Sequence, residues 1–354
     1  MLLLPSVAAQ ADLICGYEVP QPYLGPLLID SKYDQSDDSK STLDSSLDVE
    51  SDAIKSDIYA FIKLIPKIVD QAHNSEAEKQ VYLADCLSLI LDEWALPGAI
   101  LSAEATGTGK AVRKWSLATI SMALYKRSIL HPEYQLTEAQ SNWIGALSNQ
   151  VKLDYAQSPN EPFDKFNNHD YWAAWSVTVS GMLLGRDDNF DWSYQLLDKA
   201  FEQIRRHSSR HLALLPNEVE RGSLGLDYSN FALAPIVMLS VYAEKNGFPL
   251  LSENLSALDK LVTFTSMVTS DASAGSQYFD VEQTPVPAYK TTWVIPFLHF
   301  SPNHHGARKL YYQNLIVFGN YSMLGGELSD LFDLSGLEKR ARPPNTINLS
   351  VVKR

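Results

Sequence analysis

Apolar residues recur every three or four positions along most of the chain, which is the spacing expected of helices that bury one face. The first two blocks contain Ile54, Ile58, Phe61, Ile62, Ile65 and Val69, and then Val81, Leu83, Leu87, Ile90, Leu91 and Trp94. Further blocks cover about 112–127, 137–153, 171–184, 190–206, 229–246, 254–269 and 308–320. Proline and glycine separate the blocks, and strand patterns are sparse. About ten helices with short connections predict an antiparallel helical array, either a bundle or a toroid of helical hairpins.

Several segments lack this pattern. Residues 31–52, "SKYDQSDDSKSTLDSSLDVESD", are rich in Ser and Asp and predict a mobile loop or lid, the alternative being a disordered linker. Residues 271–292 are also expected to be a loop. Residues 1–11 are either the remnant of a signal peptide or a plain N-terminal arm. Residues 336–354 are expected to form a flexible basic tail.

The bulk properties narrow the class of protein. With 354 residues, 45% hydrophobic and 20% charged, the chain has the composition of a globular protein of one large or two small domains. No apolar stretch approaches the roughly 18 residues that cross a bilayer, so we expect no membrane segment. Two cysteines, Cys15 and Cys86, allow at most one disulfide, and both the bridged and the free state are open.

The formal charge of −13 argues against a nucleic-acid partner, because phosphate binding needs a basic surface. A local basic cleft can still bind a polyanion, since screening at physiological salt acts over about 8 Å. "GTGKA" (107–111) lacks the preceding glycine and the following Ser or Thr of a phosphate loop. His207 and His211 have helical metal-ligand spacing but no third ligand, so no metal site is predicted.

The stretch "NNHDYWAAWS" (167–176) carries the first candidate chemistry. On a helix, Asn168, Trp172 and Trp175 lie on one side, and His169 lies above Trp172. One interpretation is a ledge for a sugar ring, with indole faces beside an amide and an imidazole. The other is a buried helix that begins with a polar cap.

The stretch "LPNEVERGSLGLDYSNFAL" (215–233) carries the second. Arg221 and Tyr228 are seven residues apart, so both can face one cleft if the segment is helical. Gly222 and Gly225 make a continuous helix doubtful. The alternative is a surface arginine and a half-buried tyrosine.

Taken together, "GPLLIDSKYDQSD", "TGKAVRKWSLA", "NNHDYWAAWSV", "LPNEVERGSLGLDYSNFAL" and "LGGELSDLF" resemble the alginate lyases of polysaccharide lyase family 5, in order, from about Cys15 to Phe332. The resemblance implies an all-α fold: an incomplete (α/α) toroid of antiparallel helical hairpins, over a single domain at 12–335, with a long cleft and an N-terminal lid loop at 31–52. It implies mannuronate-rich alginate as substrate and no cofactor. We also expect a monomer and a periplasmic or secreted location.

By the same resemblance, the catalytic residues are Asn168, His169, Arg221 and Tyr228. The substrate-binding residues are expected to be Lys32, Tyr33, Trp172, Trp175 and Arg113. This sequence departs from the family after Arg221, where two glycines replace longer side chains, and over 271–306, which leaves the distal subsites open.

These residue types suit β-elimination from a uronate, in which loss of the C5 proton adds charge to an existing carboxylate. Asn168 and Arg221 can donate hydrogen bonds to that charge, and His169 can serve as a further donor or as an auxiliary base. Tyr228 is the candidate base and acid for mannuronate, whose C5 hydrogen and C4 oxygen share a face. Arg221 and a protonated His169 are expected to favour its phenolate.

Two other functions remain open at this stage. The first alternative to an alginate lyase is a lyase for another polyuronate, such as polyglucuronate. The second is a non-catalytic glycan-binding toroid. A glycoside hydrolase needs a pair of carboxylates flanking the bond. Glu218 and Asp227 are present, but nothing in the sequence marks them as such a pair.

Overall fold

The computed structural model describes residues 12–44, 49–275, 277–314, 321–334 and 337. Each block of helical spacing contains a helix within the described residues, so the predicted helical array is confirmed; residues 315–320 of the last block lie outside them. The long helices are α1 (Val49–His73), α2 (Ala77–Ala95), α3 (Gly107–Leu130), α4 (Glu138–Asp154), α5 (Asn168–Leu184), α6 (Asp188–Arg206), α8 (Gly225–Tyr242) and α9 (Ser252–Ser270).

Short elements complete the fold. β1 (Asp12–Ile14) and β2 (Tyr17–Val19) form an antiparallel hairpin. The short helical elements are η1 (Ser158–Asn160), α7 (Pro216–Val219), η2 (Gly222–Leu224), α10 (Ala272–Gly275), η3 (Ala288–Thr291), α11 (Val294–Phe300), α12 (His305–Asn314) and η4 (Ser322–Leu324).

Two predicted loops differ from the structure. The loop predicted at 31–52 ends earlier, because α1 already begins at Val49, where acidic residues in the first turn suit the positive end of the helix dipole. The loop predicted at 271–292 contains α10 and η3. Segments 1–11, 45–48 and, apart from Leu337, 336–354 lie outside the described residues, so the leader, the tail and the domain limits stay predictions.

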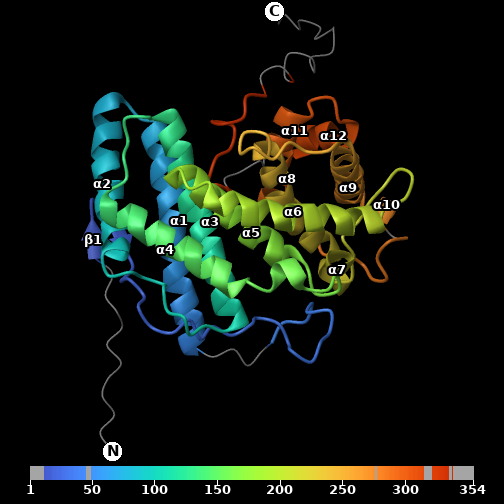
Figure 1. Ribbon diagram of the computed structural model, residues 1–354, viewed down its shortest axis with the longest axis horizontal. Helices are drawn as coiled ribbons and strands as arrows, with labels where there is room; N and C mark the ends of the chain where they lie inside the picture. Colours follow the sequence, from blue (N-terminus) through green and yellow to red (C-terminus); the bar gives the residue numbers. More distant parts are fainter. Residues whose placement is uncertain (1–11, 45–48, 276, 315–320, 335–336, 338–354) are drawn as a thin grey trace, which may run out of the picture.

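The helices form two groups joined by a shared centre. In Figure 1, α1 to α4 occupy the left of the molecule, and α8, α9, α11 and α12 occupy the right, with α5 and α6 running between them. The buried side chains form two large clusters that follow this division. Helix α5 contributes to both, with Ala173 and Val177 in one and Ala174 and Trp175 in the other.

Helix α5 is buried on every side along Tyr171–Gly181, which is the environment of a central core helix. Trp172 and Trp175 are both 0% exposed, and the indole of Trp172 donates to the carbonyl of Phe231 at 3.1 Å. The two ends of the helix reach the edge of the core, at the first turn and at residues 182–184. The polar side chains that can reach a ligand are therefore those of the first turn, Asn168 and His169.

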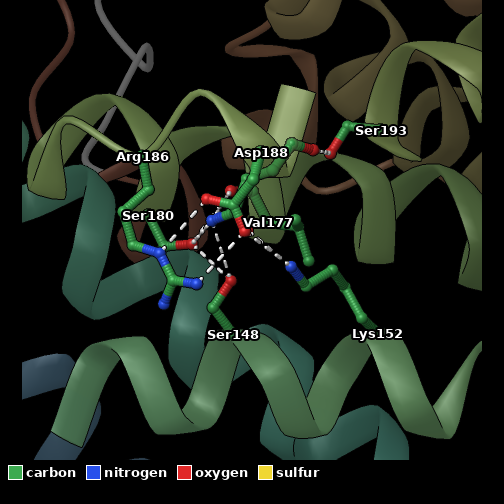
Figure 2. Close-up of polar contacts among 8 residues, drawn as sticks. Ser148, Lys152, Val177, Ser180, Arg186, Asp188 and Ser193 are labelled. Carbon is green, nitrogen blue, oxygen red and sulfur yellow. Dashed lines mark hydrogen bonds and ion pairs between the residues drawn. The ribbon is translucent and has the colours of Figure 1, made fainter. Parts of the chain in front are cut away.

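A buried polar cluster ties α6 to α4 and α5, and Figure 2 shows its members. The Asn189 amide donates to Ser148 Oγ at 3.1 Å, and it accepts from Lys152 Nζ at 2.8 Å. Ser180 of α5 donates to the same Ser148 at 2.9 Å. Because buried amides and hydroxyls are costly when unpaired, this network fixes how the three helices sit against one another.

Cys15 and Cys86 form a disulfide that attaches the β1–β2 hairpin to α2, with a Cα–Cα distance of 5.9 Å. This settles the alternative that the sequence left open. The bridge closes a separation of 71 residues. On the chain-entropy argument, restricting a loop of that length in the unfolded chain stabilises the fold by about 4 kcal/mol.

Within the described part of the chain, one helical stretch, Gly222–Tyr242, is long and apolar enough to cross a membrane by length and composition alone. The expectation that no stretch approaches this length was therefore wrong. However, 78% of its apolar window is buried inside the protein. Burial against neighbouring helices accounts for the composition of α8 as that of a core helix.

Candidate active site

A cleft of about 1260 Å³ opens between the two groups of helices. Eight basic side chains and five acidic side chains line it, although the whole chain carries a charge of −13. The basic residues are Lys32, Lys40, Lys55, Lys63, Lys110, Lys165, Lys290 and Arg221. The local balance of charge is thus opposite to that of the chain, and it favours an anionic ligand.

The start of α5 brings two polar side chains to the cleft. Asn167 is the N-cap, and its side chain accepts a hydrogen bond from the backbone N–H of His169 at 3.0 Å. Asp170 completes a capping box by accepting from the N–H of Asn167 at 2.9 Å. Because the cap is Asn167, the side chains of Asn168 and His169 remain available for other contacts, and both line the cleft.

Glu218 of α7 holds Asn168 in place. Its two carboxylate oxygens accept from the backbone N–H of Asn168 at 2.7 Å and from the side-chain Nδ2 at 2.9 Å. Burial raises the pKa of Glu218 to about 7, although the hydrogen bonds from Asn168 act in the opposite direction. The oxygen and nitrogen of a side-chain amide can exchange places by rotation. Because ionised Glu218 can only accept hydrogen bonds, it fixes the orientation in which Nδ2 of Asn168 points toward Glu218.

His169 is partly buried at the wall of the cleft. Its Nδ1 lies 2.7 Å from Nζ of Lys114, which comes from α3. Burial lowers the pKa of His169 well below its usual value, and the charges of Lys114 and Arg221 lower it further. The expectation of a protonated His169 was therefore wrong, because two cations beside a buried imidazole favour its neutral form.

Arg221 and Tyr228 meet across a break in the helix. The chain leaves α7 at Val219, turns through Arg221 and η2, and starts α8 at Gly225. A side chain at Gly225 would lie 2.5 Å from the carbonyl oxygen of Val219, so only glycine allows this close turn. The doubt about a continuous helix was correct, and the two residues come together by a turn.

The guanidinium of Arg221 stacks on the ring of Tyr228, with its Cζ atom 3.9 Å from the ring centroid. Its Nε is buried and has no hydrogen-bond partner among the described residues. A buried charged donor without a partner is costly, and such groups are usually completed by a ligand, an ion or water.

Tyr228 is held as a neutral phenol in the free protein. Burial raises its pKa above the usual value, which the nearby Arg221 only partly offsets, and the neighbouring Tyr33 adds to the rise. The expectation that the phenolate is favoured was wrong, because desolvation of the hydroxyl outweighs the attraction of the cation.

The loop at 31–44, which we call the lid, covers this pair of residues. The hydroxyl of Tyr228 donates to that of Tyr33 at 3.0 Å, and Arg221 donates to the carbonyl of Lys40 at 3.1 Å. Lys32 Nζ lies 4.9 Å from the ring centroid of Tyr33. In Figure 1 the lid is the blue segment that passes below the helices before α1.

The conformation of the lid is fixed by hydrogen bonds within the loop and by its close packing on the turn after Arg221. Asp37 accepts hydrogen bonds from the backbone N–H groups of Ser39, Ser41 and Thr42 at 2.8–2.9 Å. Gly222 has a φ of +51°, and a side chain there would lie 2.9 Å from Oγ of Ser41. The glycine after Arg221 therefore lets the lid approach the turn.

Three predicted substrate-binding residues lie away from the cleft. Trp172 and Trp175 are enclosed in the core and offer no face to a sugar. Arg113 is also 0% exposed; it pairs with Asp154 and donates from Nε to the carbonyl of Ile100 at 2.9 Å. Their assignment to the substrate was wrong, since each side chain is consumed by internal packing or pairing.

The sequence reasoning missed several residues of the site. Trp115 supplies the indole that lines the cleft, with its ring centroid 5.9 Å from that of His169. Lys114 and Glu218 support the polar pair from behind. Lys290 pairs with Asp227 at the far wall. The one available signal was a lysine in the apolar run of α3, within the segment "RKWSLA".

The fold and the site define an all-α protein with a large cleft whose charge opposes that of the whole chain. A family model described as alginate lyase matches residues 28–274, and the chain belongs to this family, polysaccharide lyase family 5. It is 35% identical over 250 residues to an alginate lyase of Pseudomonas syringae pv. syringae (strain B728a), covering 69% of this chain and 63% of the relative. To an alginate lyase of Pseudomonas putida (strain F1) it is 33% identical over 247 residues, covering 68% and 64%.

The chain thus spans just under two thirds of the length of these relatives. Among solved structures, it is similar to alginate lyase A1-III from Sphingomonas species A1, with a TM-score of 0.67 and 19% identity, over 92% of this chain and 88% of that one. A variant of the same enzyme complexed with a tetrasaccharide gives a TM-score of 0.70 at 18% identity, with the same coverage. This likeness confirms the predicted (α/α) toroid fold.

Proposed function

We propose that the protein is an alginate lyase that cleaves mannuronate-rich chains by β-elimination. The observation that carries the proposal is Arg221: its guanidinium lies in a basic cleft, stacked on Tyr228, with a buried Nε that has no partner among the described residues. The membership of the alginate lyase family and the anionic nature of a polyuronate agree with it.

The charge that develops in the reaction explains the donors around the cleft. Removal of the C5 proton turns the sugar carboxylate into an enolate-like dianion. Arg221 and the second hydrogen of the Asn168 amide, which Glu218 does not use, can stabilise this charge. His169, which is neutral, adds a third donor. We assign these three residues to neutralisation of the carboxylate.

Tyr228 then handles both protons. The C5–H bond breaks and its proton goes to the phenol oxygen, while the phenol proton goes to the C4 oxygen as the C4–O bond breaks and the C4=C5 bond forms. A single hydroxyl can do this because both positions of β-D-mannuronate lie on one face. Since the pKa of Tyr228 is raised by burial, we infer that the two transfers overlap and no free phenolate accumulates.

The cleft supports a polymeric substrate, and the disulfide supports a cellular location for the protein. The size of the cleft and its basic lining suit several linked uronates, and the lid supplies Lys32 and Tyr33 above them. The Cys15–Cys86 disulfide favours an oxidising compartment, so we propose a periplasmic or secreted enzyme that acts as a monomer.

The test is digestion of polymannuronate, polyguluronate and polyglucuronate, followed by the ultraviolet absorbance of the unsaturated product. We expect the largest initial rate on polymannuronate. Faster cleavage of polyglucuronate would reassign the substrate, and binding of all three polymers without absorbance would mean a glycan-binding protein.

The Tyr228→Phe variant tests the mechanism. Because one hydroxyl performs both the base and the acid step, its removal should lower kcat by about 10⁴-fold while alginate still binds. Tyr278→Phe is the matched control, since Tyr278 packs on Phe264 away from the cleft. Near-normal turnover of Tyr228→Phe would remove Tyr228 from the reaction.

A further inference from the structure

Lys114 lies behind the imidazole of His169 and does not line the cleft. It projects from α3, is 0% exposed, and ends between two groups from other elements. Its Nζ donates to the hydroxyl of Tyr155 at 2.8 Å and lies 2.7 Å from Nδ1 of His169. A lysine that is completely buried is uncommon, and its presence here calls for an explanation by its partners.

Burial lowers the pKa of Lys114 well below the usual value, and the nearby carboxylates of Asp170, Glu218 and Asp154 only partly offset this. The role of Lys114 therefore follows from its contacts: Nζ donates to the hydroxyl of Tyr155 and lies within hydrogen-bond distance of Nδ1 of His169. When Lys114 is an ammonium it has no acceptor, so Nδ1 of His169 accepts, and the single hydrogen of the neutral imidazole sits on Nε2.

We propose that Lys114 is a positioning residue that locks His169 as the Nε2–H tautomer, so that the imidazole presents a donor to the cleft. The tautomer of His169 is a property of the free protein. Only the catalytic consequence of that tautomer rests on the proposed lyase function. The consequence is a division of labour: His169 can neutralise the substrate carboxylate, and it has no free lone pair with which to take the C5 proton.

The groups facing His169 come from four parts of the fold, and they agree with this assignment. Lys114 lies behind it on α3, Trp115 lies beside it, and Arg221 approaches from the turn after α7. Asp170, Glu218 and Asp154 are the acidic groups near this cluster. With two cations near the ring, the imidazole stays neutral, so its tautomer is what decides its role.

The direct test is the long-range ¹H–¹⁵N spectrum of histidine-labelled protein, with the His169 signals assigned by their loss in His169→Gln. We expect a single Nε2–H tautomer from about pH 5 to about pH 8. In Lys114→Met we expect a mixture of tautomers and a higher His169 pKa, because the cation is gone. An Nδ1–H tautomer in the unmodified protein would overturn the proposal, whether or not the protein cleaves alginate.

A kinetic test does not require a change at Lys114. The amide nitrogen of glutamine occupies nearly the place of Nε2, so His169→Gln keeps a donor but cannot act as a base. We expect its kcat to exceed that of His169→Ala by about 10-fold or more. Equal losses in the two variants would mean that His169 is the base, and would overturn the tautomer lock.

A double-mutant cycle separates positioning from mere support of the fold. Lys114→Met should lower kcat by about 10- to 100-fold with little change in KM, as removal of partners behind functional histidines does. In the His169→Gln background the same change should cost less than about 3-fold, because no imidazole remains to be locked. An equal loss in both backgrounds would show that Lys114 acts only on the structure. If Lys114→Met does not fold, the spectrum and the two His169 variants still decide.

Discussion

Asn168 and His169 reach the cleft from the first turn of a buried helix, whereas Lys32 and Tyr33 reach it from the lid. The first pair, with its supports Lys114 and Glu218, forms what we call the floor of the site. On the floor, each side chain is held by a buried partner. In the lid, Lys32 is exposed and the loop is held by its own backbone contacts to Asp37.

This difference separates two kinds of contribution to function. Groups on the floor are fixed before any ligand arrives, so they can stabilise charge in the transition state without reorganising. Groups in the lid act near water, where a single charge is screened and worth little. Changes on the floor should therefore affect kcat, and changes in the lid should affect KM.

Arg221 joins the two regions, and its loss should give the largest effect. Arg221→Ala removes a donor from the carboxylate and the cation above Tyr228, so kcat/KM should fall by about 10²- to 10³-fold, or about 3 kcal/mol. It should also raise the pKa of Tyr228 further, because the one neighbour that lowers it is gone. Initial rates on polymannuronate across pH measure both effects.

Arg221→Lys is the matched control for charge. It keeps the cation but loses the planar fork that stacks on Tyr228, so we expect an intermediate rate. A lower melting temperature with unchanged turnover in Arg221→Ala would mean that the residue serves only to hold the lid to the turn.

Glu218→Gln should give a smaller loss that depends on pH. Ionised Glu218 accepts two hydrogen bonds from Asn168, so the floor is fully assembled only above its pKa of about 7. Activity of the unmodified protein should fall as pH drops through about 7. Glutamine places an amide donor against a donor, so we expect roughly 10-fold lower kcat and no such acidic limb.

The contribution of Glu218 to folding stability changes with pH in the direction opposite to activity, so the two effects can be separated. The pKa of Glu218 is higher in the folded chain than its usual 4.5, so the folded state binds the proton more tightly. This group therefore stabilises the fold at low pH, and that stability is lost as pH rises from about 4.5 to about 7. Melting temperatures at about pH 5 and about pH 7 measure this change in stability. Loss of activity that tracks unfolding at low pH would contradict the assignment.

The sequence predicts the helices and the main polar residues of the site because both are local signals. Helical spacing locates α1 to α6, and Gly222 and Gly225 correctly indicate the break before α8. The prediction that Trp172 and Trp175 bind the sugar was wrong for a physical reason. Spacing shows that Trp172 and Trp175 share a side of the helix, but α5 is buried all round, so no side is marked as facing the cleft.

The supporting residues were beyond local reasoning. Lys114 and His169 are 55 positions apart, and Asn168 and Glu218 are 50 apart. Nothing in either neighbourhood indicates that α3, α5 and α7 converge at one point. Tyr33 and Tyr228, which are 195 positions apart, meet only because the lid crosses the cleft. Side-chain partners of this kind depend on the tertiary fold.

Lys32→Ala should give the smallest effect, and it should appear in a different constant. Because Lys32 is exposed at the edge of the cleft, its loss should raise KM for polymannuronate by about 2- to 5-fold and leave kcat unchanged. The difference should shrink at high salt, since the interaction is screened. Lys79→Ala, an exposed lysine on α2 that does not line the cleft, is the matched control. A fall in kcat in Lys32→Ala that persists at high salt would mean that the lid belongs with the floor in positioning the reacting sugar.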